Sequence, residues 1–196
     1  MSLARLKPFP FLHASHANAF QVFAGAEVST SHIQLHYRIK ANSKESFDSI
    51  IFPDLLSKPL RQDDLWKSTC FEAFTPARES SAYLEFNGAP NGNWNWYAFR
   101  DYRQGMTLVP VVPGLMPKQV SISRGETEFE AKWMLPFAGV RQGLLSGGAG
   151  PNDLGRFGLT VVLSTQEATT YWAVEHVGVK PDFHLKASFT YDPFRN

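Results

Sequence analysis

Two glutamates stand inside segments that have the composition of β-strands. Glu72 lies in the run Thr-Cys-Phe-Glu-Ala-Phe, and Glu85 lies in the run Tyr-Leu-Glu-Phe-Asn. If residues 76–81 close these segments into a hairpin with Glu72 opposite Glu85, the two side chains share one face, with Cβ atoms about 4.5–5.5 Å apart. The same face would carry Cys70, Phe74, Tyr83 and Asn87. Like charges at that distance destabilise a sheet, so a cation, a shared proton or hydrogen bonds must compensate.

Three kinds of chemistry fit such a pair. The first is a structural network in which a nearby arginine balances the carboxylates, with Arg38, Arg100 and Arg103 as candidates. The second is a ligand-binding face on which the glutamates and Asn87 accept hydrogen bonds from sugar hydroxyls, while Arg100 or Arg38 balances their charge. The third is a glycosidase pair, because retaining enzymes hold their carboxyl groups about 5–5.5 Å apart. Nothing in the sequence marks a deep cleft, so we expect a binding protein rather than an enzyme.

Tryptophans supply a second feature of sugar-binding sites. Indole rings stack on the apolar C–H faces of sugars, while neighbouring Asn, Glu and Arg side chains pair with the hydroxyls. Trp66, Trp94 and Trp172 are the candidates for stacking, whereas Trp133, inside an alternating segment, is expected in the core.

The six histidines show no metal-binding spacing, although His184 lies near Asp182 in a loop-like stretch. No methionine is paired with a histidine in sequence as an axial haem pair would be, so we expect no cofactor.

The elements that position these residues follow a period of two. Apolar and polar residues alternate over 33–39, which indicates a strand with one buried face. Further strands are predicted at 69–75, 82–87, 94–100, 119–123, 126–133, 156–164 and 169–175. Short helical turns are expected near 47–56 and after Pro136, and 143–152 is predicted to be a long surface loop. The pattern predicts an all-β protein, an antiparallel β-sandwich of jelly-roll type, formed by one domain over 1–196.

The composition of the chain limits the classes of molecule that it is expected to bind. The chain has 196 residues, 43% of them hydrophobic, and a formal net charge of +1 without a basic stripe, which disfavours nucleic acid. The single cysteine, Cys70, excludes an intramolecular disulfide and is expected to be a buried thiol. The N-terminal stretch has no continuous apolar core of a secretion signal, and no run approaches the ~18 apolar residues of a membrane span. We therefore expect a cytoplasmic protein that does not bind membranes.

Three segments, taken in order, form a larger pattern. They are Asp-Leu-Trp-Lys-Ser-Thr-Cys-Phe-Glu-Ala-Phe (64–74) followed by Tyr-Leu-Glu-Phe-Asn-Gly-Ala-Pro-Asn-Gly-Asn-Trp (83–94), then Phe-Glu-Ala-Lys-Trp-Met-Leu-Pro-Phe (129–137), and Tyr-Trp-Ala (171–173) leading through Lys-Pro-Asp-Phe-His (180–184) to Phe189. This order and spacing resembles the bacterial DOMON-like proteins, which are related to the family 9 carbohydrate-binding modules.

The resemblance implies a sandwich that binds a ligand on one sheet face. Related modules bind sugars, often between two tryptophans, other DOMON branches bind haem, and some relatives hold calcium in a loop. By that analogy the ligand face carries Trp66, Glu72, Glu85, Asn87, Trp94, Arg100, Trp172 and His184.

The sequence therefore predicts a non-catalytic module for a small saccharide or a sugar-containing ligand. The alternative from another class is a protein-interaction or self-association domain, in which the carboxylates are only a structural network. A haem-binding DOMON protein and a glycosidase are further alternatives.

Overall fold

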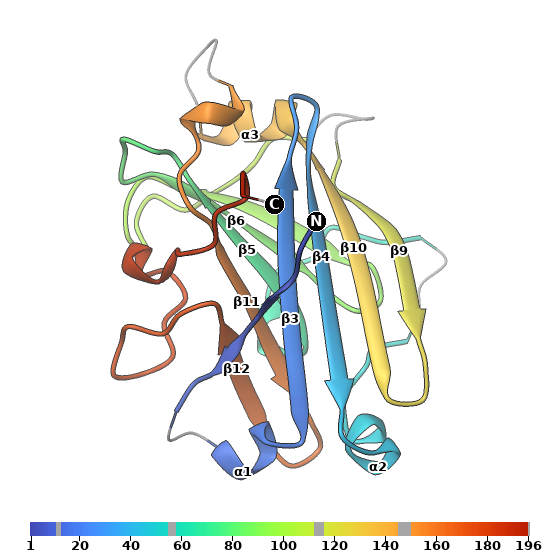
Figure 1. Ribbon diagram of the computed structural model, residues 1–196. Helices are drawn as coiled ribbons and strands as arrows, with labels where there is room; N and C mark the ends of the chain where they lie inside the picture. Colours follow the sequence, from blue (N-terminus) through green and yellow to red (C-terminus); the bar gives the residue numbers. More distant parts are fainter. Residues whose placement is uncertain (11–12, 55–57, 112–115, 145–149, 196) are drawn as a thin grey trace.

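The computed structural model describes residues 1–10, 13–54, 58–111, 116–144 and 150–195, which form two antiparallel sheets packed face to face (Figure 1). Sheet A has five strands, in the order β1 (Ala4–Arg5), β3 (Phe20–Val28), β4 (His32–Ala41), β10 (Glu128–Pro136) and β9 (Lys118–Arg124). Sheet B has seven, in the order β2 (Lys7–Pro8), β12 (Thr169–Ala173), β11 (Gly158–Ser164), β5 (Cys70–Pro76), β6 (Tyr83–Gly88), β7 (Trp94–Phe99) and β8 (Thr107–Leu108). The predicted all-β sandwich is confirmed.

The long strand β3 was not predicted, although its inward positions alternate. Alanine at positions 24 and 26 and glycine at position 25 weaken the hydrophobic signal of this segment. The glycine is required because the N-terminal residues cross β3 here: a Cβ on Gly25 would lie 2.6 Å from the backbone oxygen of Ser2. The other strands that the pattern missed, β1, β2 and β8, are two residues long, which is too short for a period to be detected.

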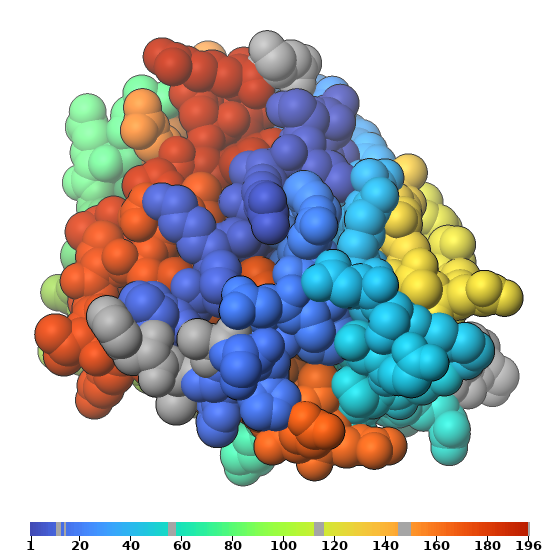
Figure 2. Space-filling model, turned by 60° about the horizontal axis from the view of Figure 1, so that its bottom comes forward, coloured from blue at the N-terminus to red at the C-terminus, as the bar shows by residue number. Residues whose placement is uncertain are grey.

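The helices are short and lie at the ends of the sandwich. They are α1 (Ala14–Ala17), α2 (Lys44–Asp48) and α3 (Phe137–Leu144), with 3₁₀ turns η1 (Leu65–Lys67), η2 (Pro151–Asp153) and η3 (Lys186–Ser188). Figure 2 looks onto the end where α1 and α2 lie side by side. The helix after Pro136 is confirmed. The turn predicted near 47–56 instead begins at residue 44, because Ser43 caps α2 by accepting a hydrogen bond from the Ser46 amide. Residues 55–57, and 145–149 of the predicted loop, lie outside the described residues.

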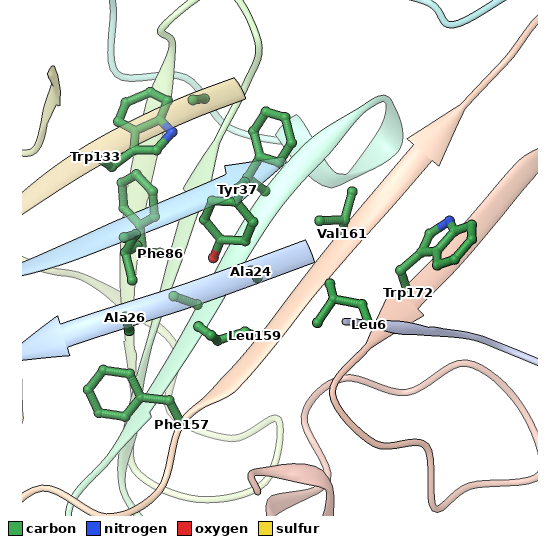
Figure 3. Packing of buried hydrophobic residues seen from close by; sticks show 14 of the residues in the cluster. Leu6, Ala24, Ala26, Tyr37, Phe86, Trp133, Phe157, Leu159, Val161 and Trp172 are labelled. Atoms are coloured by element: carbon green, nitrogen blue, oxygen red, sulfur yellow. The ribbon is translucent and has the colours of Figure 1, made fainter. Parts of the chain in front are cut away.

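The hydrophobic core fills the space between the sheets (Figure 3). Trp133 on β10 is fully buried there, as predicted, and packs edge-on against Phe86 of β6. Tyr37 on β4 reaches across the core, and its hydroxyl donates a hydrogen bond of 2.7 Å to the backbone oxygen of Glu72. Strand β5 is thereby tied to sheet A at the residue that carries the first of the two glutamates.

Candidate functional site

The β5–β6 hairpin places both glutamates on the outer face of sheet B, but not directly opposite each other. Glu72 faces Asn87, and Glu85 faces Phe74. The predicted register is therefore wrong by two residues, because the turn is centred one residue further along the chain than expected. A shift of two keeps every side chain on its predicted face. It makes the glutamates diagonal neighbours, and residues in such pairs lie about 7–8 Å apart.

Above these residues is a pocket of about 450 Å³. Its floor is the outer face of sheet B, and residues from the loops at 66, 103–106 and 181–184 form its rim. The lining residues are Trp66, Glu72, Phe74, Glu85, Tyr97, Phe99, Arg103, Met106, Val162, Tyr171, Pro181, Phe183 and His184. Carboxyl groups at the floor and aromatic rings around it give the pocket both polar and apolar surfaces, which is typical of small-molecule sites.

Glu72 is 3% exposed, and its two cross-strand partners, Asn87 and Thr160, are uncharged. Its Oε2 accepts a hydrogen bond of 3.0 Å from the Thr160 hydroxyl, and this is the only hydrogen bond that the carboxyl group forms with the described residues. Burial and, to a lesser degree, the charge of Glu85 raise the pKa of Glu72 to about 8. The carboxyl group therefore changes its charge near neutral pH.

Glu85 is 6% exposed, and its partners are also uncharged. Its Oε1 accepts a hydrogen bond of 2.7 Å from the side-chain amide of Asn87, and its Oε2 lies 3.7 Å from Nε2 of His184. Burial raises the pKa of Glu85 to about 7, against the opposing effect of the Asn87 hydrogen bond. Asn87 is fully buried and its carbonyl oxygen lies 3.5 Å from the Cys70 sulfur, so it positions Glu85 rather than presenting free groups to the pocket.

His184 connects the pocket floor to the rim. Its Nδ1 lies 2.7 Å from the Tyr83 hydroxyl, and its ring packs edge-on against Phe74 and Phe99. Burial, with the nearby charge of Arg103, lowers the pKa of His184 to about 4. The imidazole is consequently neutral at pH 7, and it does not neutralise Glu85.

Arg103 is the arginine that lines the pocket, but Asp182 holds it. Its Nη2 donates to Oδ1 of Asp182 at 2.9 Å, and the hydroxyl of Tyr102 donates to the other oxygen of the same carboxylate. The two other arginines considered as counterions lie elsewhere. Arg38 pairs with Glu130 on the outer face of sheet A, and Arg100 is exposed just beyond the end of β7 and does not line the pocket.

The tryptophans separate into two groups. Trp66, at the start of the rim, is 36% exposed and its ring meets Tyr97 edge-on at 5.8 Å. Trp94 and Trp172 are 5% and 2% exposed and belong to the core between the sheets, where Figure 3 shows Trp172 beside Leu6. The structure thus keeps Trp66, Glu72, Glu85 and His184 at the pocket and removes Trp94, Trp172 and Arg100 from it.

The alternation of side chains along each strand explains why two predicted tryptophans lie in the core and why two tyrosines that were not predicted line the pocket. On β7, Trp94 and Trp96 point into the core, so Tyr97, which pairs with Glu85, faces the pocket. On β12, Trp172 points inward, so its neighbour Tyr171 points outward into the pocket. These two tyrosines could have been found from the sequence by applying the period of two to each strand. Phe183 could not, since it lies in a loop.

Haem and calcium, the cofactors considered above, each require particular ligands. Met106 and His184 do line it together, but Nδ1 of His184 is engaged by Tyr83 and its Nε2 faces Glu85, so neither nitrogen is directed at a haem iron. Calcium takes 6–8 oxygen ligands, and in the described residues no group of three or more His, Cys, Asp or Glu side chains is arranged to hold a metal. In that same part of the chain, none of the helices has the length and apolar character needed to span a membrane.

Comparison with known proteins bears on the fold. No family model and no curated protein sequence matches the chain. Among solved structures, a "putative carbohydrate-binding protein" from Bacteroides uniformis superposes with a TM-score of 0.65 at 14% sequence identity, over 94% of this chain and 83% of that one. At this identity the likeness establishes a shared fold: the chain has the sandwich architecture of that protein.

Proposed function

We propose that this protein is a non-catalytic binding module whose pocket on sheet B holds a small saccharide or a sugar-containing ligand. The observation that carries the proposal is a cavity of about 450 Å³ that combines two buried carboxyl groups with aromatic walls. Carboxyl oxygens accept hydrogen bonds from hydroxyl groups, and the rings of Trp66, Tyr97 and Tyr171 offer flat apolar surfaces to a sugar ring. The shared fold with the Bacteroides uniformis protein supports the same class of ligand. Membership of the DOMON-like group is part of this proposal.

The chemistry of the pocket favours binding over glycoside hydrolysis. A glycosidase pair divides its roles between a protonated acid and an ionised nucleophile or base. Burial raises the pKa of both Glu72 and Glu85, and neither forms an ion pair with an Arg or Lys among the described residues that would keep it ionised. The two carboxyl groups therefore have similar pKa values, whereas a glycosidase needs one protonated acid and one ionised nucleophile or base.

A thermal-shift screen of the purified chain against mono- and disaccharides and nucleotide sugars tests the proposal. A ligand at a hundredfold excess over its Kd stabilises a protein by about 2.7 kcal/mol, which is a measurable rise in Tm. We expect a dose-dependent rise with one class of sugar. Trp66→Ala should reduce that rise with little effect on the Tm of the free protein, because the ring is only partly buried.

Val120→Ala is the matched control, since Val120 is an exposed apolar residue on β9 of the other sheet. This variant should respond to the ligand like the original chain. A flat response to the whole panel, with association that depends on protein concentration in light scattering, would replace the proposal by the interaction-domain alternative. Turnover of an activated aryl glycoside that is lost in both Glu72→Gln and Glu85→Gln would replace it by a glycosidase.

A further inference from the structure

We propose that the pocket selects a saccharide that carries a protonated amine, with the ammonium group held between Glu72 and Glu85. This inference rests on the proposed function, because it assigns the chemistry of the ligand in the same pocket. It follows from the aromatic rings around the two carboxyl groups and from the lack of an ion pair between either group and an Arg or Lys of the described residues.

The pocket floor contains acids without cations. Glu72 forms no ion pair with any described residue, and the ion-pair distance of Glu85 is to His184, which is neutral at pH 7; the charge of Arg103 acts on both carboxyl groups from further away and lowers their pKa only in part. Arg103 is the cationic side chain of the lining, and its guanidinium is paired with Asp182. Buried carboxyl groups without a counterion favour the neutral form, and ionisation becomes favourable when a cation is placed beside them. A ligand that brings its own positive charge would supply the missing partner.

The free oxygen atoms suit an ammonium group. One oxygen of each carboxyl is already used, by Thr160 at Glu72 and by Asn87 at Glu85. The remaining oxygens are Oε1 of Glu72 and Oε2 of Glu85; neither forms a hydrogen bond with a described residue, and Oε2 of Glu85 lies 3.7 Å from Nε2 of His184. An ammonium group has three donors and no acceptor, so it can donate to both. The diagonal register separates the two residues enough to admit a ligand atom between them.

The walls add a second attraction for a cation. The faces of Trp and Tyr rings attract ammonium groups, most strongly where water is excluded. Trp66, Tyr97 and Tyr171 line the pocket beside the carboxyl groups. An anionic sugar, such as a sugar phosphate, would instead bring its charge next to two acids. The lining therefore discriminates by charge as well as by shape.

Ammonium binding would be coupled to proton release. A nearby cation favours the ionised carboxylate, so groups with pKa values of about 8 and about 7 would lose protons when the amine binds at pH 6–7. The other charged or titratable groups that face them are Cys70, Tyr83, Tyr97, Arg103, Tyr171, Asp182 and His184. Burial holds the pKa of Cys70, Tyr83 and Tyr97 well above this range, and that of His184 well below it.

Calorimetry with three ring compounds tests the inference: glucose has hydroxyls and no amine, glucosamine has both, and cyclohexylamine has an amine and no hydroxyls. We expect glucosamine to bind at least tenfold more tightly than glucose at pH 7. Cyclohexylamine, whose amine stays protonated in this range, should release protons on binding, seen as heats that depend on the buffer. Equal or tighter binding of glucose would overturn the amine assignment and leave the saccharide proposal standing. Binding of cyclohexylamine alone would keep the amine site and overturn the saccharide proposal, and no binding by any of the three would contradict both.

Two variants test whether the preference for glucosamine depends on the carboxyl group of Glu72. Glu72→Gln keeps an acceptor for Thr160 but removes one charge, and it should reduce the affinity for glucosamine at least tenfold more than it reduces the affinity for glucose. Glu130→Gln, which removes a carboxylate from the outer face of sheet A, is the control and should leave glucosamine binding unchanged. Circular dichroism verifies that both variants are folded. Undiminished glucosamine binding by folded Glu72→Gln would overturn the inference.

Discussion

Both sheets carry glutamates within strands on their outer faces, but the two faces treat them differently. On sheet A, Glu130 pairs across the strands with Arg38, and Glu128 pairs with Lys40. On sheet B, Glu72 lies between Asn87 and Thr160, and Glu85 lies between Phe74 and Tyr97. Sheet A therefore carries a network of carboxylates and cations, but this network includes neither Glu72 nor Glu85.

The electrostatic outcome is opposite on the two faces. Burial opposes ionisation of Glu130, but the hydrogen bond and charge of Arg38 outweigh it and lower its pKa. On sheet B nothing outweighs burial, and the pKa of both glutamates is raised. Local rules that favour stability are commonly broken at functional sites. The unpaired acids on sheet B support the proposal that the ligand binds on that face, while the paired acids on sheet A form a partly exposed ion-pair network.

The largest expected effect is on stability at pH 8. Because the pKa of Glu72 in the folded protein lies above its unfolded value, the stability associated with its neutral form is complete below about pH 4.5 and is lost as the pH rises toward 8. Glu72→Gln should therefore stabilise the free protein at pH 8 by on the order of a few kcal/mol, and much less at pH 5. Urea denaturation at the two pH values measures this. Destabilisation at pH 8 would mean that the carboxylate is paired, as on sheet A.

A smaller effect is expected at the rim. Asp182→Asn removes the negative partner of Arg103 and should allow the guanidinium to approach Glu85. An internal cation there would compete with an ammonium ligand, so we expect the affinity for glucosamine to fall several-fold in calorimetry. Arg103→Ala in the same background should restore it. If the affinity falls equally with Ala at position 103, Asp182 acts by shaping the loop rather than by restraining Arg103.

The smallest effect is expected on sheet A, with the opposite sign to that of Glu72→Gln. Glu130→Gln breaks its pair with Arg38, and since both side chains are partly exposed the loss should be below about 1 kcal/mol. That loss should be present at pH 8 and shrink as the pH falls toward the lowered pKa of Glu130. Urea denaturation under the same conditions provides the comparison. A gain in stability at pH 8 would remove the contrast between the two faces.

The sequence by itself determined the sandwich and the face on which the acids lie. A period of two fixes which side of a strand each residue occupies, and an error of two in the hairpin register left Glu72 and Glu85 on the predicted face. The same rule, applied to β7 and β12, would have moved Trp94 and Trp172 into the core and brought Tyr97 and Tyr171 to the pocket.

Only the tertiary structure decided which groups meet across the pocket. Arg38 and Arg103 are equally plausible counterions in sequence, but strand order places the first on sheet A, and Asp182 restrains the second. His184 and Phe183 reach the pocket from a loop, where no period predicts direction. The raised pKa values depend on burial by these loops and on the neutral cross-strand neighbours, and both are consequences of pairing between segments far apart in the chain.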